Sequence, residues 1–298
     1  MHKWWWLVVI FVLWAGAGLG LFAGAGRASH GGGREPWSAR RIVSAAPNLT
    51  EILFALGLDE KIAGVSSDSD WPPRAREKRQ MGSFWEPNLE AIIAARPDLV
   101  VTLGFSQQKA MARRLERMGY HSLTVDIEST GGLFAAIERI GDMTGRKQQA
   151  EILVRDLKAK LENLGRLTAG SYRPKVLYVV QREPLRVAGR DTFINELLEF
   201  AGGENAIGRT LHQYPPIGAE QVLSCGADVI IEPAMGRESL DAQQRSAVEY
   251  WKRFANVAAV KNERIYVIPP DTVSRLGPRL YDGAERIARC VRPGLFGE

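Results

Sequence analysis

The sequence predicts an α/β protein built from two Rossmann-like lobes that are joined by one long rigid helix, with a ligand cleft between the lobes. Three observations lead to this fold class. Short apolar strands alternate with helical segments from Arg41 onward, which is typical of mostly parallel sheets. A long amphipathic segment lies near the middle of the chain, and a pattern in the first half returns in the second.

The composition is that of a globular protein. The chain has 298 residues, of which 45% are hydrophobic and 24% charged. At about 150 residues per domain this length corresponds to two domains. Disordered, collagen-like and polytopic membrane proteins are excluded. Two cysteines, Cys225 and Cys290, are too few for a disulfide scaffold or a cysteine zinc cluster. They could form one disulfide at most.

The charge balance argues against nucleic acid as a partner. The formal net charge is +5, and it falls to +3 when the basic residues Lys3 and Arg27 are removed with the leader. Such a small and dispersed excess does not form a nucleic-acid footprint.

Residues 1–28 have the plan of a secretory signal peptide. Lys3 precedes an unbroken apolar run over 4–14, and small residues follow, with expected cleavage after Ala25 or Ala28. An uncleaved membrane anchor is the alternative, because the uncharged stretch 7–26 is just long enough to span a bilayer.

Residues 29–40 then read as a flexible tether before a folded part that we expect to begin near Arg41. No cysteine lies near the expected cleavage region, which argues against a bacterial lipoprotein anchor. We therefore expect a periplasmic protein, or one that stays attached through its uncleaved leader.

The segment 41–145 is predicted to form the N-terminal lobe. Helices are expected over Thr50–Leu56, which Gly57 closes, and from the cap Asn88 through Ala95. A further helix should bury Met111, Leu115 and Met118 on one face. The expected strands are Arg41–Ser44, Ile62–Ser66, Leu99–Leu103 and Leu123–Val125.

A linking helix is predicted over 146–170. Its apolar residues recur every three or four positions, which gives one buried stripe. They are Ala150, Leu153, Leu157, Leu161 and Leu164. A new strand begins at Lys175, so 171–298 is predicted to be a C-terminal lobe.

The two halves repeat a pattern. Glu90 stands eight residues before Asp98, which leads a buried strand, and Glu220 stands eight residues before Asp228, which leads another. Each lobe should therefore contain a helix that opens with glutamate, then a turn and a strand. Two such lobes form a cleft, where ligands bind.

No catalytic motif stands out. The sequence has no P-loop and no serine nucleophile elbow, and only His121 and His212 occur within the expected folded part. Too few histidines are present for a zinc-binding protein. Aromatic and arginine residues in predicted loops are better candidates for ligand contacts. They are Trp71, Phe84, Trp85, Tyr214 and Arg275.

From Arg41 to the C-terminus the chain resembles the periplasmic cobalamin-binding and iron-chelate-binding family of solute-binding proteins of ABC importers. The resemblance rests on the order and spacing of several short motifs, none decisive alone. They are 41–57, Gly64–Ser67 with Asp70–Pro73, Pro87–Ile92 with Pro97–Val100, Gly202–Asn205, Ala219–Val222 and Gly277–Leu280.

The resemblance implies a transport role. A member of this family delivers its ligand to a permease dimer in the inner membrane, and its lobes move little because a continuous helix resists bending. Glu90 and Glu220 match two family glutamates that dock into arginine pockets of the permease subunits. Without the resemblance, we would infer only that each glutamate stabilises the N-terminus of its helix through the helix dipole. The resemblance implies no cofactor, no bound metal of the protein's own, and a monomer.

The resemblance also implies ligand-binding residues. Phe84 and Tyr214 occupy positions of cobalamin-binder tryptophans, and Arg275 matches an arginine of the cleft. Three departures make the pocket more polar: Asp68 replaces a tyrosine, Leu103 a tryptophan and Arg186 a phenylalanine. The expected contacts are Ala46, Pro47, Asp68, Trp71, Phe84, Trp85, Arg186, Tyr214 and Arg275.

The leading ligand is a corrinoid. A ferric siderophore is the alternative, because a cationic pocket would balance its charge. The resemblance makes haem less favoured, because relatives that bind haem have a tyrosine near the positions of Phe84 and Trp85 and this chain has none there. A different class, an exported α/β hydrolase, is disfavoured because no nucleophile and base pair is recognisable.

Overall fold

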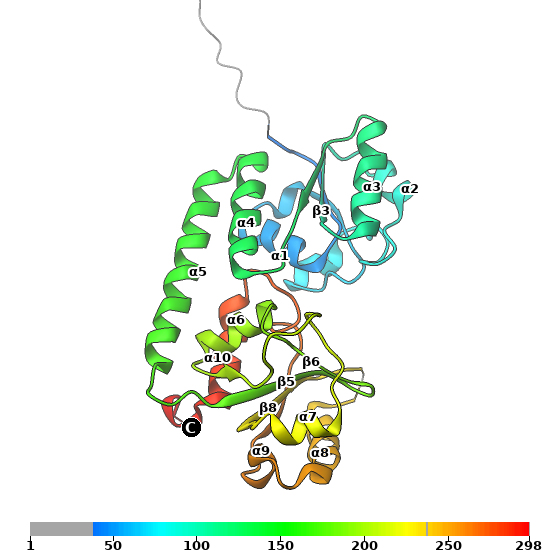
Figure 1. The fold of residues 1–298 in the computed structure, drawn as a ribbon. Coiled ribbons are helices and arrows are strands. Elements are labelled where there is room, and N and C mark those ends of the chain that lie inside the picture. Colours follow the sequence, from blue (N-terminus) through cyan, green and yellow to red (C-terminus); the bar gives the residue numbers. More distant parts are fainter. Residues whose placement is uncertain (1–37, 237, 298) are drawn as a thin grey trace, which may run out of the picture. The chain divides into compact units, whose positions relative to one another are not determined.

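The computed structural model describes residues 38–236 and 238–297, so the predicted leader 1–28 lies outside the described part of the chain. Ala39 is fully buried, and its amide donates to the Met143 carbonyl at 3.1 Å. The packed chain therefore includes Ser38 to Arg40, which the sequence assigned to the tether, and the expected start near Arg41 is slightly late. The described elements are labelled in Figure 1.

The N-terminal lobe contains a four-stranded sheet whose strands are all parallel, in the order β2-β1-β3-β4. The central strands β1 and β3 are completely buried, as their continuous apolar sequence predicts. The strands are β1 (Ile42–Ser44), β2 (Ile62–Val65), β3 (Leu99–Leu103) and β4 (Ser122–Val125).

Local sequence signals start and end the helices of this lobe. α1 begins at Pro47, earlier than the expected Thr50, because a proline is well suited to the first turn of a helix. The side chain of Asn88 caps α2 by accepting from the Ala91 amide, which confirms that predicted cap. The helices are α1 (Pro47–Ala55), α2 (Leu89–Ala94), α3 (Ser106–Arg117) and α4 (Thr130–Thr144).

The predicted apolar face of α3 is only partly correct. Leu115 is fully buried, but Met118 lies beyond the end of the helix at Arg117 and is 51% exposed. The helix stops too early to bring Met118 back to the buried face.

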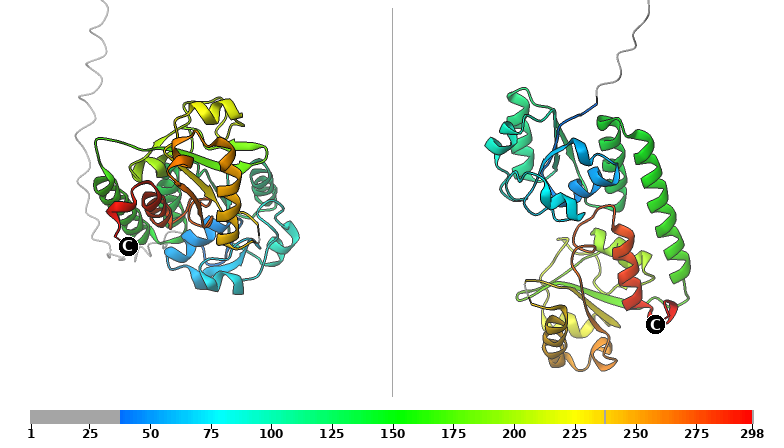
Figure 2. Two further views of the ribbon diagram at one scale, coloured as in Figure 1. Left: turned by 90° about the horizontal axis from the view of Figure 1, so that it is seen from below. Right: turned by 180° about the vertical axis from the view of Figure 1, so that it is seen from behind.

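The predicted linking helix is α5 (Lys147–Thr168), which is continuous over 22 residues and about 33 Å long. It begins directly after the left-handed Gly145, which ends α4. Its buried stripe contains Val154 instead of the predicted Leu153, which is only half-buried. α5 runs along both lobes on one side (Figures 1 and 2).

The C-terminal lobe has a five-stranded sheet in which β5, β8, β9 and β7 are parallel. The sequence missed β6, which pairs antiparallel with the end of β5 and makes this lobe's sheet mixed. The strands are β5 (Lys175–Arg182), β6 (Leu185–Val187), β7 (Glu204–Asn205), β8 (Val229–Pro233) and β9 (Ile265–Ile268).

Helices surround this second sheet. α6 is capped by Thr192, whose hydroxyl accepts from the Asn195 amide, and α8 is capped in the same way by Ser239. The helices are α6 (Phe193–Phe200), α7 (Ala219–Ser224), α8 (Leu240–Trp251), α9 (Ala258–Lys261) and α10 (Leu280–Val291).

The predicted repeat is present in both lobes. Asp98 accepts from the backbone amide of Arg41 at the start of β1, and Asp228 accepts from that of Lys175 at the start of β5, each at 2.8 Å. Each aspartate therefore fixes the entry of the first strand of its lobe. Glu90 and Glu220 are the second residues of two six-residue helices, α2 and α7.

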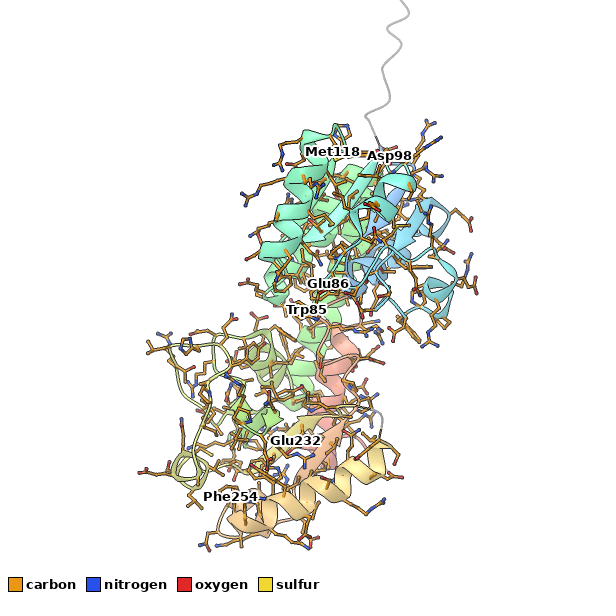
Figure 3. The ribbon with its side chains drawn as sticks, turned by 90° about the vertical axis from the view of Figure 1, so that its right-hand side faces the viewer. Trp85, Glu86, Asp98, Met118, Glu232 and Phe254 are labelled. Carbon is orange, nitrogen blue, oxygen red and sulfur yellow. The ribbon has the colours of Figure 1, made fainter. Side chains whose placement is uncertain are left out.

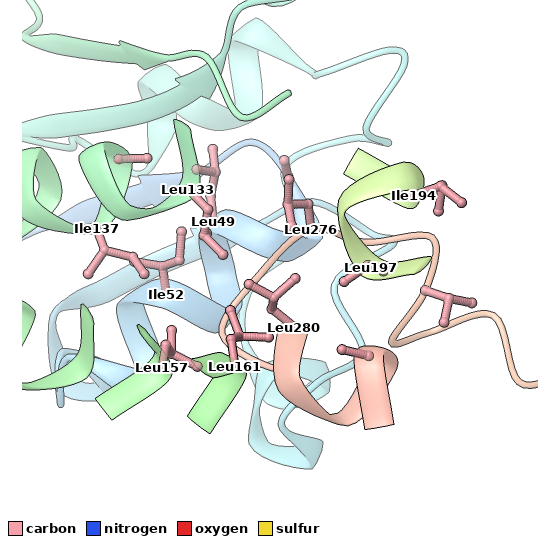
Figure 4. Packing of buried hydrophobic residues seen from close by; sticks show 14 of the residues in the cluster. Leu49, Ile52, Leu133, Ile137, Leu157, Leu161, Ile194, Leu197, Leu276 and Leu280 are labelled. Atoms are coloured by element: carbon pink, nitrogen blue, oxygen red, sulfur yellow. The ribbon is translucent and has the colours of Figure 1, made fainter. Parts of the chain in front are cut away.

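One hydrophobic core crosses from lobe to lobe. Buried side chains from α1, α4 and α5 pack in the same cluster as side chains from α6 and α10 (Figure 4). Leu49 and Leu276, which lie on different lobes, both belong to it. Separating the lobes would expose this apolar surface to water. The free-energy cost is about 25 cal/mol for each Å² exposed.

Within residues 38–236 and 238–297, no helix is both long enough and apolar enough to cross a membrane.

Candidate ligand-binding cleft

A cavity of about 390 Å³, called here the first cavity, lies between the lobes. The N-terminal lobe contributes the ends of β3 and β4 and the loops that follow them, together with Pro47 at the start of α1. The C-terminal lobe contributes Phe193 at the start of α6 and the segment Ser274–Leu276. The first cavity is therefore the cleft that the two-lobe fold predicts.

Three aromatic rings form one wall of the first cavity. The rings of Phe84 and Phe105 meet edge to face with centroids 5.5 Å apart, and Trp85 packs on Phe84 at 4.7 Å. Trp85 is 65% exposed although its side chain is large and apolar. Figure 3 shows Trp85 at the edge of the N-terminal lobe that faces the other lobe. Such a wall suits a broad, flat ligand.

Two side chains hold the loop that carries Phe84. Asp68 accepts from the Phe84 amide at 2.5 Å. Gln108, which is 1% exposed, donates to the carbonyls of Phe84 and Ala45 at 3.1 Å each and accepts from the Leu103 amide at 2.7 Å. Gln108 thus ties the ends of β1 and β3 to the aromatic wall, a role that the sequence analysis missed.

We expect Gln108→Leu to lower the free energy of unfolding by about 1–3 kcal/mol, because leucine leaves buried backbone groups without partners. Urea unfolding would measure the loss. Gln107→Leu is the matched control, since Gln107 is exposed on the same helix and should change stability little. Equal stability of both variants would show that the Gln108 bonds do not hold the loop.

The charged groups of the first cavity are mainly acidic. Asp68, Asp126 and Glu128 line it together with one cation, Arg275. Arg275 is already paired, at 2.5 Å, with Asp70 of the opposite lobe. The cationic pocket that would favour a ferric siderophore is therefore not what these residues form, because the carboxylate of Asp70 neutralises Arg275.

A second ion pair also joins the lobes. The guanidinium of Arg279, at the start of α10, donates to both carboxylate oxygens of Glu51 on α1, at 2.9 and 2.5 Å. Trp71 stacks on the same guanidinium, 4.9 Å from the ring centroid. We call Glu51, Arg279 and Trp71 the lobe clamp. Trp71 is thus a clamp residue and is not among the residues that line the first cavity.

Electrostatics hold the clamp together. The hydrogen bonds that Arg279 donates to the Glu51 carboxylate raise the pKa of Arg279, so the guanidinium stays charged. Burial raises the pKa of Glu51, while the hydrogen bond and charge of Arg279 act in the opposite direction. Glu51 is only 4% exposed, so it depends on Arg279 for compensation.

The internal repeat supplies a reciprocal contact between the lobes. Glu196 of α6 accepts from the Thr130 amide at the start of α4, at 2.7 Å. In each case a glutamate on the helix after the first strand of one lobe reaches the start of a helix of the other lobe. The carboxylate at the α4 N-terminus is also favoured by the helix dipole.

Of the remaining predicted ligand residues, Pro47 lines the first cavity and the other three do not. Ala46 is fully buried as the N-cap of α1, while the neighbouring Pro47 lines the cavity. Arg186 is exposed on β6 and donates to the Tyr214 carbonyl at 3.2 Å. Tyr214 lines a separate cavity of about 490 Å³ in the C-terminal lobe, called here the second cavity.

Glu90 and Glu220 are both exposed. Neither carboxylate has an ion-pair partner within the described ranges 38–236 and 238–297. Each is therefore available to a partner outside the chain.

The described residues offer little for covalent or metal chemistry. In this part of the chain no three His, Cys, Asp or Glu side chains are grouped to hold a metal ion. His121 and His212 line neither cavity. Cys225 and Cys290 are both free thiols, which answers the question of a disulfide between them.

Several cavity residues carried no sequence signal that separated them from core residues. Phe105, Ile127 and Phe193 line the first cavity, but each follows or begins a regular element like many buried residues. The position after a strand end was the available clue, because ligands bind at the carboxyl ends of parallel strands.

The chain is similar to known solute-binding proteins over most of its length. The family model described as "Periplasmic binding protein" matches residues 42–272. An uncharacterized ABC transporter substrate-binding lipoprotein of Bacillus subtilis is 30% identical, over 87% of this chain and 82% of the relative. A vitamin B12-binding protein of Vibrio cholerae is 25% identical, over 87% of this chain and 91% of the relative.

Solved structures have the same two-lobe fold. A possible iron-binding, periplasmic solute-binding protein of Staphylococcus epidermidis has a TM-score of 0.75 and 28% identity, covering 86% of this chain and 99% of its own. A periplasmic heme-binding protein of Pseudomonas aeruginosa has a TM-score of 0.75 and 26% identity, covering 86% and 93%. The relatives are periplasmic or lipoprotein substrate-binding proteins, which places such a chain outside the cytoplasm.

Proposed function

From the premise that the chain belongs to the periplasmic binding protein family, which serves ABC transporters, we propose that it binds a corrinoid in the first cavity and delivers it to a permease dimer. The observation that carries the choice of ligand is the combination of an aromatic wall with carboxylates and a neutralised arginine. The Vibrio cholerae relative named for vitamin B12 supports the same choice.

The chemistry of a corrinoid fits this cavity. A corrinoid is a large flat ring whose edges carry amides. Its faces can pack on Phe84, Trp85 and Phe105, and its amide N–H groups can donate to Asp68, Asp126 and Glu128. The protein needs no metal ligands of its own because the corrin ring already holds the cobalt.

The ferric siderophore and haem are less well supported. Haem and ferric catecholates are anionic, and an anion would face three carboxylates, of which Asp126 is paired with Lys109 at 3.5 Å, while Arg275 is already paired with Asp70. The Staphylococcus protein is titled a possible iron-binding protein and the Pseudomonas protein a heme-binding protein, so ferric chelates and haem belong in the test.

We propose that delivery uses Glu90 and Glu220. Their support is the equivalent position on α2 and α7, the exposure of both side chains and the absence of ion-pair partners among the described residues. We propose that the N-terminal leader exports the protein to the periplasm. The protein acts there as a monomer.

A fluorescence titration with cobalamin, cobinamide, ferric hydroxamate and catecholate siderophores and haem tests the ligand. We expect tryptophan quenching and sub-micromolar affinity with the corrinoids, and at least tenfold weaker binding of the anionic chelates.

Trp85→Ala should weaken corrinoid binding at least tenfold because it removes the most exposed of the three rings of the aromatic wall. Tyr172→Ala is the control, since Tyr172 is 62% exposed and lines neither cavity. Tight binding of a ferric chelate or haem, with no response to either corrinoid, would contradict the choice of ligand and leave the family unchanged.

A further inference from the structure

The end of the N-terminal lobe that lies away from the first cavity is formed by the amino ends of its parallel strands. The strands β1, β3 and β4 are neighbours in the sheet, so the segments that precede them lie together. Figure 3 shows Asp98 and Met118, which precede β3 and β4, at this end of the lobe and Trp85 at the opposite end. We call this surface the distal face. Its exposed residues include Arg40, Arg96, Arg114, Arg117 and Met118.

The four arginines of the distal face have no ion-pair partner among residues 38–236 and 238–297. Two carboxylates lie near them. Asp98 accepts from the backbone amides of Arg40 and Arg41, at 2.8 Å each, and Glu116 accepts from the Ser122 hydroxyl. The arginines outnumber these carboxylates. The net charge of the whole chain is small, but the fold therefore gathers positive charge on this one face.

The corresponding end of the C-terminal lobe uses its arginines differently. Arg173, which precedes β5, donates to the Gly203 carbonyl at 2.6 Å, and Arg264, which precedes β9, donates to the Val291 carbonyl at 2.8 Å. These guanidinium groups hold the backbone of their own lobe. The four guanidinium groups of the distal face make no such hydrogen bond within the described part of the chain, so the fold leaves them available to a partner.

An anionic phospholipid surface has the chemistry that fits the distal face. A guanidinium group stays charged and donates parallel N–H bonds to phosphate oxygens, and basic clusters bind anionic lipid surfaces electrostatically. Met118, which is 51% exposed beside the arginines, can enter the boundary between headgroups and acyl chains. The described chain also begins beside this face, at Ser38, which follows the end of the uncharged stretch 7–26 by 38 − 26 = 12 residues.

We propose that the distal face binds the anionic phospholipid surface of a membrane and so keeps the protein close to the membrane that contains its permease. The attraction acts whether or not the leader is cleaved, because the arginines belong to the folded lobe. It is independent of the choice of ligand, because no arginine of the distal face lines either cavity.

Vesicle flotation tests this surface. The protein used lacks residues 1–28, so that the leader cannot insert into the vesicles, and the packed cores of both lobes are retained. We expect binding to vesicles of phosphatidylglycerol mixed with phosphatidylcholine, and no binding to vesicles of phosphatidylcholine alone. Binding should be lost at an ionic strength of about 1 M, where the screening length falls to about 3 Å.

Replacing Arg114 and Arg117 together with glutamine should weaken binding to the anionic vesicles at least tenfold, because each basic group near the lipid surface adds to the attraction. The matched control replaces Arg209 and Arg245, which are exposed on the other lobe and have no ion-pair partner among the described residues. It has the same change in net charge and should bind like the wild-type protein. Both variants should keep wild-type stability in urea.

Three results would overturn the inference. The first is the absence of binding to the anionic vesicles, and the second is equal binding to the neutral vesicles. The third is equal weakening by both pairs of substitutions, which would show that the net charge of the chain, and not the distal face, attracts the lipid. Each of these results would leave the proposed ligand and the docking glutamates unaffected.

Discussion

Replacing Glu90 and Glu220 together with alanine is expected to abolish stimulation of the transporter while ligand affinity stays the same. Both carboxylates are exposed, unpaired within the described ranges, and outside the lining of either cavity. Charge pairs formed on docking can be worth several kcal/mol when they are desolvated, so losing one pair on each lobe removes most of the docking energy. ATPase stimulation of the reconstituted permease measures the effect.

The matched control replaces one exposed glutamate of each lobe elsewhere, Glu77→Ala with Glu238→Ala. This variant has the same change in net charge and should stimulate normally. Full stimulation by the Glu90 and Glu220 variant, or loss of its ligand binding, would rule out the docking role.

Breaking the lobe clamp is expected to cause the largest loss of stability. Arg279→Leu leaves the Glu51 carboxylate buried without its partner, and removal of one member of a buried pair costs about 3–5 kcal/mol. Urea unfolding measures the loss. Replacing both Glu51 and Arg279 with leucine should recover most of it, because no unpaired charge is then buried.

Arg289→Leu on the same helix is the control for the clamp. Its partner is Glu285, and Arg289 is half exposed, so this pair contributes about 0–1 kcal/mol. If Arg279→Leu costs no more than Arg289→Leu, the clamp does not hold the lobes. The clamp, the shared core and the continuous α5 together support the expectation of only small lobe motion on binding.

Periodic patterns predicted the main elements of the fold. The stripe of α5, the buried run of β3 and the Asn88 cap each depend on local sequence, so they could be read without a structure. The repeated spacing of Glu90 with Asp98 and Glu220 with Asp228 predicted two corresponding lobes. β6 was missed because an antiparallel edge strand of three residues has too little periodicity to recognise.

The site was less predictable because its charges depend on contacts between distant segments. The sequence predicted Arg275 as a ligand contact, and only the fold brings Asp70, 205 residues away, against its guanidinium. The sequence predicted Trp71 as a ligand contact, whereas in the fold its ring stacks on the guanidinium of Arg279. Gln108 is one of two adjacent glutamines, and nothing in the sequence tells the buried one from the exposed one.

Corrinoid binding is tested most directly by calorimetric titration of the purified protein with cobalamin. We predict one ligand per chain, recovered unchanged, with a Kd below 1 µM, which corresponds to about −8 kcal/mol or better. The absence of heat with both cobalamin and cobinamide at these concentrations, together with tight binding of a ferric chelate, would contradict the account.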